Sequence, residues 1–222
     1  MKLLNFIVAM EDVADGKVFE EHERTFYVRI SDFDQLKRAA SADHQEQWTQ
    51  KFAKTEKNAA KGNIRVRKIY PLFKNGEPVG YSRSEGSGVQ YVLTAKAERS
   101  ATHRQEVPVP ATEAMFEIFK ALADSGMVKD RYHFPVAGTD LVFEVDMFRR
   151  GETYEDGYHE WAKIDLEFNK DKHAGMAIPE LPIQVDQVIM DNTTVPLEKA
   201  MISDIYDRCF LTKNPLATPK AD

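Results

Sequence analysis

The sequence predicts an α+β fold in which antiparallel strands form most of the structure. Seven or eight segments alternate apolar and polar residues with the period of two that is typical of a β-strand. Residues 112–124 and 196–210 carry apolar side chains at helical spacing, so two amphipathic helices are available to cover the apolar faces. Nearly every strand also has ionisable residues on its polar face, a pattern that favours a barrel with a charged interior over a simple sandwich.

Composition favours a soluble globular protein. Of the 222 residues, 42% are hydrophobic and 30% are charged, and we expect residues 1–222 to form a single domain. The net charge of −6 argues against general binding to nucleic acid or to an anionic membrane. The single cysteine, Cys209, excludes an internal disulfide framework, and we expect a cytoplasmic protein that does not associate with membranes.

The first part of the chain predicts two strands and then helical segments. Residues 3–10 and 19–30 form the strands, and residues 3–10 are too short to span a membrane. Asp32 is placed to cap a short helix. The charge-rich residues 43–60 predict a second helix with few apolar anchors, either an exposed connector or a mobile lid.

The middle of the chain predicts three strands and a helix. The strands cover residues 63–70, 91–98 and 102–107, with a tight turn at residues 74–76. Pro108 and Pro110 are expected to end the third of them. Thr112 then caps a helix whose apolar stripe is Met115, Phe116, Phe119, Leu122 and Ala123, and Gly126 is expected to stop it.

The last part predicts three more strands, at residues 129–134, 141–148 and 161–168. Residues 169–192 are expected to be a loop. Pro196 opens a final helix, and residues 214–222 are expected to be a frayed tail.

The ionisable strand positions form an acidic set and a basic set. The acidic set is Glu21, Glu23, Glu144, Asp146, Asp165 and Glu167. The basic set is Arg65, Arg67, Lys96, Arg104, Lys129 and Arg131. An unpaired buried ion is costly, so the two sets must pair with each other or with a ligand. A metal–polyphosphate ligand suits both sets, because carboxylates bind Mg²⁺ or Mn²⁺ and basic groups bind phosphate.

Seven short motifs follow one another along these strands. They are Glu21-His22-Glu23, Arg65-Val66-Arg67, Leu93-Thr94-Ala95-Lys96, Arg104-Gln105-Glu106, Lys129-Asp130-Arg131, Glu144-Val145-Asp146-Met147-Phe148 and Asp165-Leu166-Glu167. In type and order they resemble the motifs of the CYTH superfamily, the triphosphate tunnel metalloenzymes. That superfamily includes class IV adenylyl cyclases, thiamine triphosphatases and inorganic triphosphatases.

The resemblance implies an eight-stranded antiparallel β-barrel, a triphosphate tunnel, with flanking helices. Its core would span about residues 19–170, with a helical insertion at about residues 34–62 and a C-terminal helix at about residues 196–211. The implied metal ligands are Glu21, Glu23, Asp146, Asp165 and Glu167. The implied phosphate-binding residues are Arg65, Arg67, Lys96, Arg104, Lys129 and Arg131. For catalysis we expect Glu106 or Glu144 to orient the attacking water.

Three positions differ from the family pattern, and one of them is Asp165, which stands where the closing motif has a glutamate. Thr25 stands where the first motif has a lysine, and Lys163, on the same strand face as Asp165, is the candidate substitute. Pro108 stands where the fourth motif has a third carboxylate.

The leading functional hypothesis is therefore a Mg²⁺- or Mn²⁺-dependent enzyme that hydrolyses a triphosphate: a nucleoside triphosphate, inorganic triphosphate or thiamine triphosphate. Formation of cyclic AMP from ATP, binding of a nucleotide or polyphosphate without turnover, and an interaction module whose charges only pair with one another stay open as alternatives. The expected partner is a triphosphate-bearing small molecule, and a homodimer is plausible from the resemblance.

Overall fold

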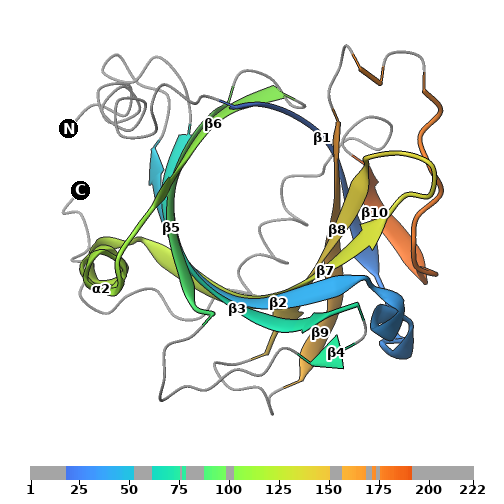
Figure 1. Ribbon diagram of the computed structural model, residues 1–222, viewed down its shortest axis with the longest axis horizontal. Helices are drawn as coiled ribbons and strands as arrows, with labels where there is room; N and C mark the ends of the chain where they lie inside the picture. Colours follow the sequence, from blue (N-terminus) through green and yellow to red (C-terminus); the bar gives the residue numbers. More distant parts are fainter. Residues whose placement is uncertain are drawn as a thin grey trace.

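The computed structural model describes residues 19–52, 62–75, 77–78, 88–98, 103–150, 157–168, 172–173 and 176–191. Its elements are β1 (Phe19–Arg29), η1 (Asp34–Arg38), β2 (Ser41–Phe52), β3 (Gly62–Lys74), β4 (Glu77–Pro78), β5 (Gln90–Glu98), β6 (His103–Pro110), α2 (Glu113–Leu122), β7 (Ser125–Pro135), β8 (Val142–Arg149), β9 (Tyr158–Phe168) and β10 (Gln187–Asp191). All the strands belong to one strongly curved antiparallel sheet (Figure 1).

The predicted fold class is wrong. An α+β fold built on an eight-stranded barrel with flanking helices was expected. The structure is instead largely β, with a sheet of ten strands and one α-helix among the described residues. Neighbours follow the order β10-β1-β6-β5-β3-β2-β7-β8-β9, with β4 on β3 and a further pairing between β1 and β9.

The largest local correction concerns the charge-rich segment predicted as a helix at residues 43–60, part of the helical insertion expected at residues 34–62. Its first ten residues belong to β2, which pairs with β3 along one edge and with β7 along the other. Hydrogen bonds to two neighbouring strands outweigh the helical propensity of polar residues in this segment. Residues 53–61 lie outside the described part of the chain.

Smaller corrections concern four other segments. The helix expected after Asp32 is the single 3-10 turn η1. Strand β6 continues through Pro108 and Pro110, opposite Thr94 and Val92 of β5. Gly126, expected to stop a helix, lies within β7 because α2 ends at Leu122. The segment expected to be a loop at residues 169–192 contributes β10.

Some predictions fall outside the described residues: the strand at residues 3–10, the C-terminal helix at residues 196–211 and the tail. The single-domain organisation stays a prediction. Within the described ranges, no helix has both the length and the apolar character needed to cross a membrane.

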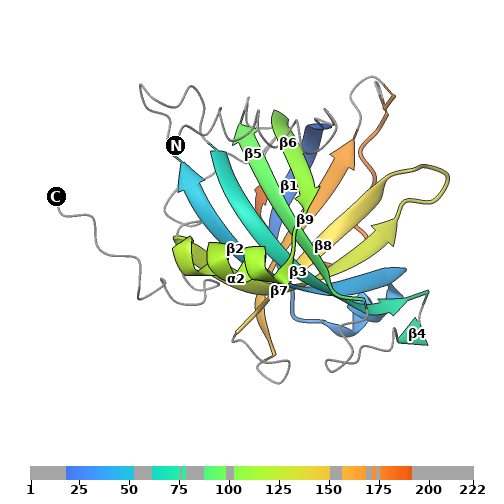
Figure 2. The same ribbon diagram turned by 60° about the vertical axis from the view of Figure 1, so that its left-hand side comes forward.

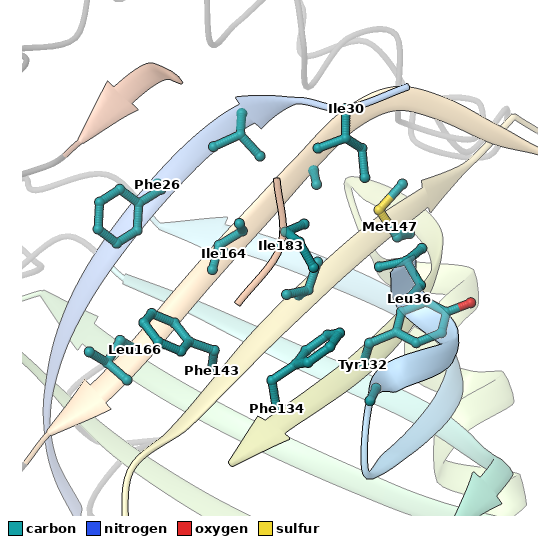
Figure 3. Close-up of a cluster of buried hydrophobic side chains, with 14 of the residues drawn as sticks. Phe26, Ile30, Leu36, Tyr132, Phe134, Phe143, Met147, Ile164, Leu166 and Ile183 are labelled. Atoms are coloured by element: carbon teal, nitrogen blue, oxygen red, sulfur yellow. The ribbon is translucent and has the colours of Figure 1, made fainter. Parts of the chain in front are cut away.

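Two apolar clusters cover the outer face of the sheet. One lies between β1, β7, β8, β9, η1 and the segment around Ile183, and includes Phe26, Phe143, Met147 and Ile164 (Figure 3). The other lies beneath α2, which packs across β2, β3 and β5 (Figure 2). Thr112 caps α2 as predicted, with its Oγ1 accepting a hydrogen bond from the Met115 backbone nitrogen at 3.2 Å. Of the predicted apolar stripe, Phe116 and Ala123 are fully buried, whereas Met115 and Leu122 are exposed.

Strand β1 has partners on both edges. His22 to Arg29 pair with β9, and Phe26 to Arg29 also pair with β10. The beginning of β1 pairs with β6. The strand that carries the first predicted motif therefore pairs with both β10 and β9, the first and last strands of the order given above.

Candidate functional site

The predicted ionisable residues share the inner, concave face of the curved sheet. Strand alternation places the apolar clusters on the outer face, so the intervening residues point inward. We call this inner surface the charged face. Its described ionisable members from the predicted sets are Glu23, Arg65, Arg67, Lys96, Glu106, Lys129, Arg131, Glu144, Asp146, Lys163, Asp165 and Glu167. Arg65 on β3 reaches Glu106 on β6 at 3.4 Å, across the intervening β5, as curvature toward this face requires.

Asp146 is the centre of an ion cluster on β7 and β8. Its Oδ2 lies 2.5 Å from Lys129 Nζ, and its two oxygens accept from Arg131 Nε and Nη2 at 2.7 and 2.9 Å. Burial alone would raise the pKa of Asp146, but Arg131 and Lys129 outweigh it and hold that pKa far below its usual range. Arg131 also forms an ion pair with Glu144. Asp146 is thus already bound by two cations.

Lys129 experiences opposing influences in the same cluster. Its burial, with the nearby Arg131, lowers the pKa of Lys129 to about 7, although Asp146 acts in the opposite direction. Lys129 is therefore poised to change its protonation state near neutral pH.

A second ion cluster lies on β3, β5 and β6. Lys96 Nζ is 2.5 Å from Glu106 Oε2, and Arg65 contacts the other oxygen of Glu106. Arg67, two residues along β3, forms no ion pair with any described residue, and its Nη2 donates a hydrogen bond to Thr94 Oγ1 at 3.4 Å. Burial, reinforced by Arg65 and Arg131, lowers the pKa of Arg67 to about 10.

The guanidinium Nε atoms of Arg65 and Arg67 are buried and have no hydrogen-bond partner among the described residues. Two such donors side by side on one strand face leave the cluster with unused capacity to bind an anion.

Lys163, the predicted substitute lysine, and Thr25 both lie beside Asp165. Thr25 lies directly opposite Asp165 in the β1–β9 register, and its hydroxyl donates to Asp165 Oδ1 at 2.7 Å. Lys163 forms an ion pair with the other oxygen of Asp165. Although burial opposes it, the ammonium of Lys163 lowers the pKa of Asp165. Thr25 and Lys163 therefore contact the same carboxylate, and the substitution of the family lysine by Lys163 stays a prediction.

Among the predicted metal ligands, Glu23 and Glu167 are directly opposite each other on β1 and β9. Glu23 is buried, whereas Glu167 is exposed. Like charges at opposed positions are destabilising, and a hard divalent cation between carboxylates relieves that cost, so their chemistry fits Mg²⁺ or Mn²⁺. No group of three or more metal-binding side chains gathers within the described ranges. The side chains of Glu21 and Arg104 lie outside those ranges.

Sequence reasoning missed the polar residues of β2, because that segment was predicted to be a helix. Asp43 lies on the charged face near His133, and burial raises the pKa of Asp43. Gln45 Nε2 donates to Asp43 Oδ1 at 2.7 Å. The alternation of these residues with Ala42, His44 and Trp48 was the available signal.

A polar network outside the charged face was also missed. Asp130 is fully buried, its Oδ1 lies 2.6 Å from His44 Nδ1, and its Oδ2 accepts from Arg149 and Tyr158. These residues come from β2, β7, β8 and β9, so no local spacing in the sequence could show their proximity.

The fold and the charged face together define a largely β protein with buried cations on its concave surface. No protein-family model matches the chain, and no curated protein matches it. Among solved structures, it is similar to the PH1819 protein from Pyrococcus horikoshii OT3, with 18% sequence identity over 68% of this chain and 81% of that chain and a TM-score of 0.39.

A second similar structure is a Bacillus halodurans protein provisionally named an adenylate cyclase. The identity is 11% over 70% of this chain and 84% of that chain, and the TM-score is 0.36.

Proposed function

We propose that this chain is a CYTH-type, divalent-metal-dependent enzyme that binds a triphosphate on the charged face and hydrolyses a phosphoanhydride bond. One observation carries the proposal. The guanidinium of Arg67 has no counter-ion among the described residues, although it lies beside Arg65 on a face that also holds Arg131 and Lys129. A face whose charges only paired with one another would not retain an uncompensated cation there.

In this proposal the basic residues bind the phosphates. Arg65 and Arg67 offer planar donors suited to phosphate oxygens, and Lys96 and Lys129 offer point charges. Arg104 and Arg131 complete the predicted set. These cations also offset the charge that develops on the phosphoryl oxygens in the transition state.

Glu23 and Glu167, with Glu21 and Asp165, would hold Mg²⁺ or Mn²⁺. Such an ion would act as a Lewis acid and neutralise the charge that develops on the phosphate. Asp146 fits this role less well than predicted, because Lys129 and Arg131 already occupy its oxygens. Lys163 keeps Asp165 ionised, and Glu106 or Glu144 would orient the attacking water.

A triphosphate panel tests the proposal. We expect phosphate release from inorganic triphosphate, ATP or thiamine triphosphate with Mg²⁺ or Mn²⁺, and none with EDTA. The double variant Glu23→Gln with Glu167→Gln should lose the metal-dependent release of phosphate. The exposed control Glu180→Gln should keep it. If ATP yields cyclic AMP and no phosphate, the reaction is cyclisation and not hydrolysis. No product and no binding from any member would overturn the proposal.

Binding without turnover is a second candidate, and Asp165 favours it. The Thr25 hydroxyl and the Lys163 ammonium occupy separate oxygens of this carboxylate, which limits its availability to a metal. Tight triphosphate binding with no product under any metal condition would select this candidate.

A further inference from the structure

The charged face contains a neutral region that the proposed hydrolysis does not use. The inward side chains of β2 include Gln45, Gln47 and Thr49, which are only 3%, 7% and 9% exposed. In the sheet, this part of β2 lies between β3, which carries Arg65 and Arg67, and β7, which carries Lys129. Uncharged groups thus separate two rows of cations.

Several acceptors in this neutral region are buried and unused. The side-chain oxygens of Gln45, Gln47, Asn63 and Ser125 have no hydrogen-bond partner among the described residues. We call these four residues the amide patch. The amide nitrogen of Gln45 is committed to Asp43, and that of Gln47 is directed at Thr49 Oγ1 at 3.4 Å. The carbonyl oxygens of both glutamines therefore remain to accept hydrogen bonds from another molecule.

An apolar cluster adjoins the amide patch on the same inner face. Met127 and Phe148 are buried together, with Trp161 and Ile189 packed against them. Met127 is the cross-strand partner of Gln47, and Phe148 is the partner of Lys129. Aromatic rings and a thioether beside unused carbonyl acceptors suit a flat ring that carries N–H donors.

We propose that the amide patch and this apolar cluster bind the organic head group of the triphosphate, a flat nitrogen heterocycle with N–H donors. This inference rests on the proposed function and narrows its substrate from any triphosphate to a nucleoside-type triphosphate. The register supports the connection to the phosphates, because Gln47 is opposite Arg67 on β3 as well as Met127 on β7. The head group and the phosphates would thus lie on adjoining strands.

Binding measurements separate the two parts of the ligand. Isothermal titration calorimetry with Mg²⁺ would compare inorganic triphosphate with the non-hydrolysable β,γ-imido analogues of ATP and GTP. We expect at least one analogue to bind about tenfold or more tightly than inorganic triphosphate. We also expect Gln47→Leu to remove about tenfold of that advantage while changing the inorganic triphosphate affinity less than twofold. The control Gln184→Leu, at an exposed position, should change neither affinity.

Fluorescence gives a readout that does not require the Gln47 variant to fold. The chain has two tryptophans, and Trp48 lies beneath α2 on the outer face. In a Trp48→Phe chain, Trp161 should change its emission with the nucleotide analogue but not with inorganic triphosphate.

Equal affinity for both ligand types, or an equal loss of both in Gln47→Leu, would overturn the head-group site and leave the triphosphate site in place. Failure to bind inorganic triphosphate and every analogue would overturn the proposed function itself.

Discussion

At the scale of single residues, Arg67 is the residue on which the proposed triphosphate binding most depends. Asp146 and Glu106 each have cationic partners at 2.5 Å, so most of the charged face is compensated. Arg67 on the same face has no ion-pair partner among the described residues, and burial lowers its pKa, so the surroundings disfavour its charge.

We predict that Arg67→Met weakens binding of inorganic triphosphate about tenfold or more. A hydrogen bond to a charged group contributes about 1.5–3 kcal/mol, and 1.4 kcal/mol is tenfold in affinity. The free energy of unfolding without ligand should be unchanged or higher, because an uncompensated cation is removed. Calorimetry and urea denaturation measure the two quantities, with the exposed Arg38→Met as control. Full affinity in Arg67→Met would contradict the assignment.

The lowered pKa of Lys129 predicts that folding is linked to the release of a proton. In the unfolded chain its pKa is about 10.4, and folding lowers the pKa of Lys129 to about 7. Between these values the unfolded state holds a proton that the folded state lacks, so the Lys129 contribution to stability increases with pH from about 7 to 10.

A bound phosphate reverses that shift, because an anion favours the charged lysine. At pH 8, we therefore predict proton uptake on binding of inorganic triphosphate. Calorimetry in buffers of different ionisation enthalpy measures it, and Lys129→Met should lower the number of protons taken up. Equal proton uptake by both chains would show that Lys129 does not titrate on binding.

At the scale of elements, the strands with clear alternation were predictable from sequence. The predicted strands at residues 63–70, 91–98, 129–134 and 161–168 all lie within observed strands, and the one at residues 141–148 begins one residue before β8. The helix capped by Thr112 was also correct. In these segments the apolar positions are frequent enough to define one period.

β2 shows why the rest could not be predicted. It is a central strand, yet its sequence is mostly polar because its inward side chains line the charged face rather than an apolar core. Its strand conformation depends on partners ten or more residues away along the chain, and local propensity does not report such partners. The two glutamines of the amide patch were missed because of this error.

Trp48 and Gly126 make a testable contact between β2 and β7. They are cross-strand partners, and a Cβ atom added at Gly126 would lie 2.7 Å from the Trp48 ring. We predict that Gly126→Ala lowers the free energy of unfolding by about 1–3 kcal/mol through overpacking. Chemical denaturation measures this loss. The smaller ring of Trp48→Phe should recover part of it in the double variant, and strictly additive losses would contradict the steric explanation.

At the scale of the whole molecule, the Asp130 network joins four strands at the outer side of the sheet. Burial raises the pKa of Asp130, but hydrogen bonds from His44, Arg149 and Tyr158 outweigh it and bring that pKa below its ordinary value. Arg149 is itself 3% exposed, so it depends on this carboxylate for compensation.

We predict that Asp130→Asn lowers the free energy of unfolding by about 3–5 kcal/mol at pH 7, because it leaves a buried cation uncompensated. Since the folded pKa of Asp130 is depressed, its contribution is fully present above the unfolded value of about 3.9 and is lost as pH falls through the folded value. Urea denaturation of both chains from pH 7 to pH 3 should show the difference shrinking with acidity. A constant difference would exclude ionisation of Asp130 as its cause.

The position of β1 has a consequence for how the molecule is made. β1 precedes every other described strand in the chain, but its partners on β9 and β10 come from residues 161–168 and 187–191. Thr25 and Asp165 are 140 residues apart, and Arg24 and Asp191 are 167 apart. Such non-local pairing slows folding, and both edges of a newly synthesised β1 stay open to wrong partners until the ribosome has delivered β9 and β10. The strand that carries the first motif is therefore synthesised early, but its pairing with neighbouring strands is completed late.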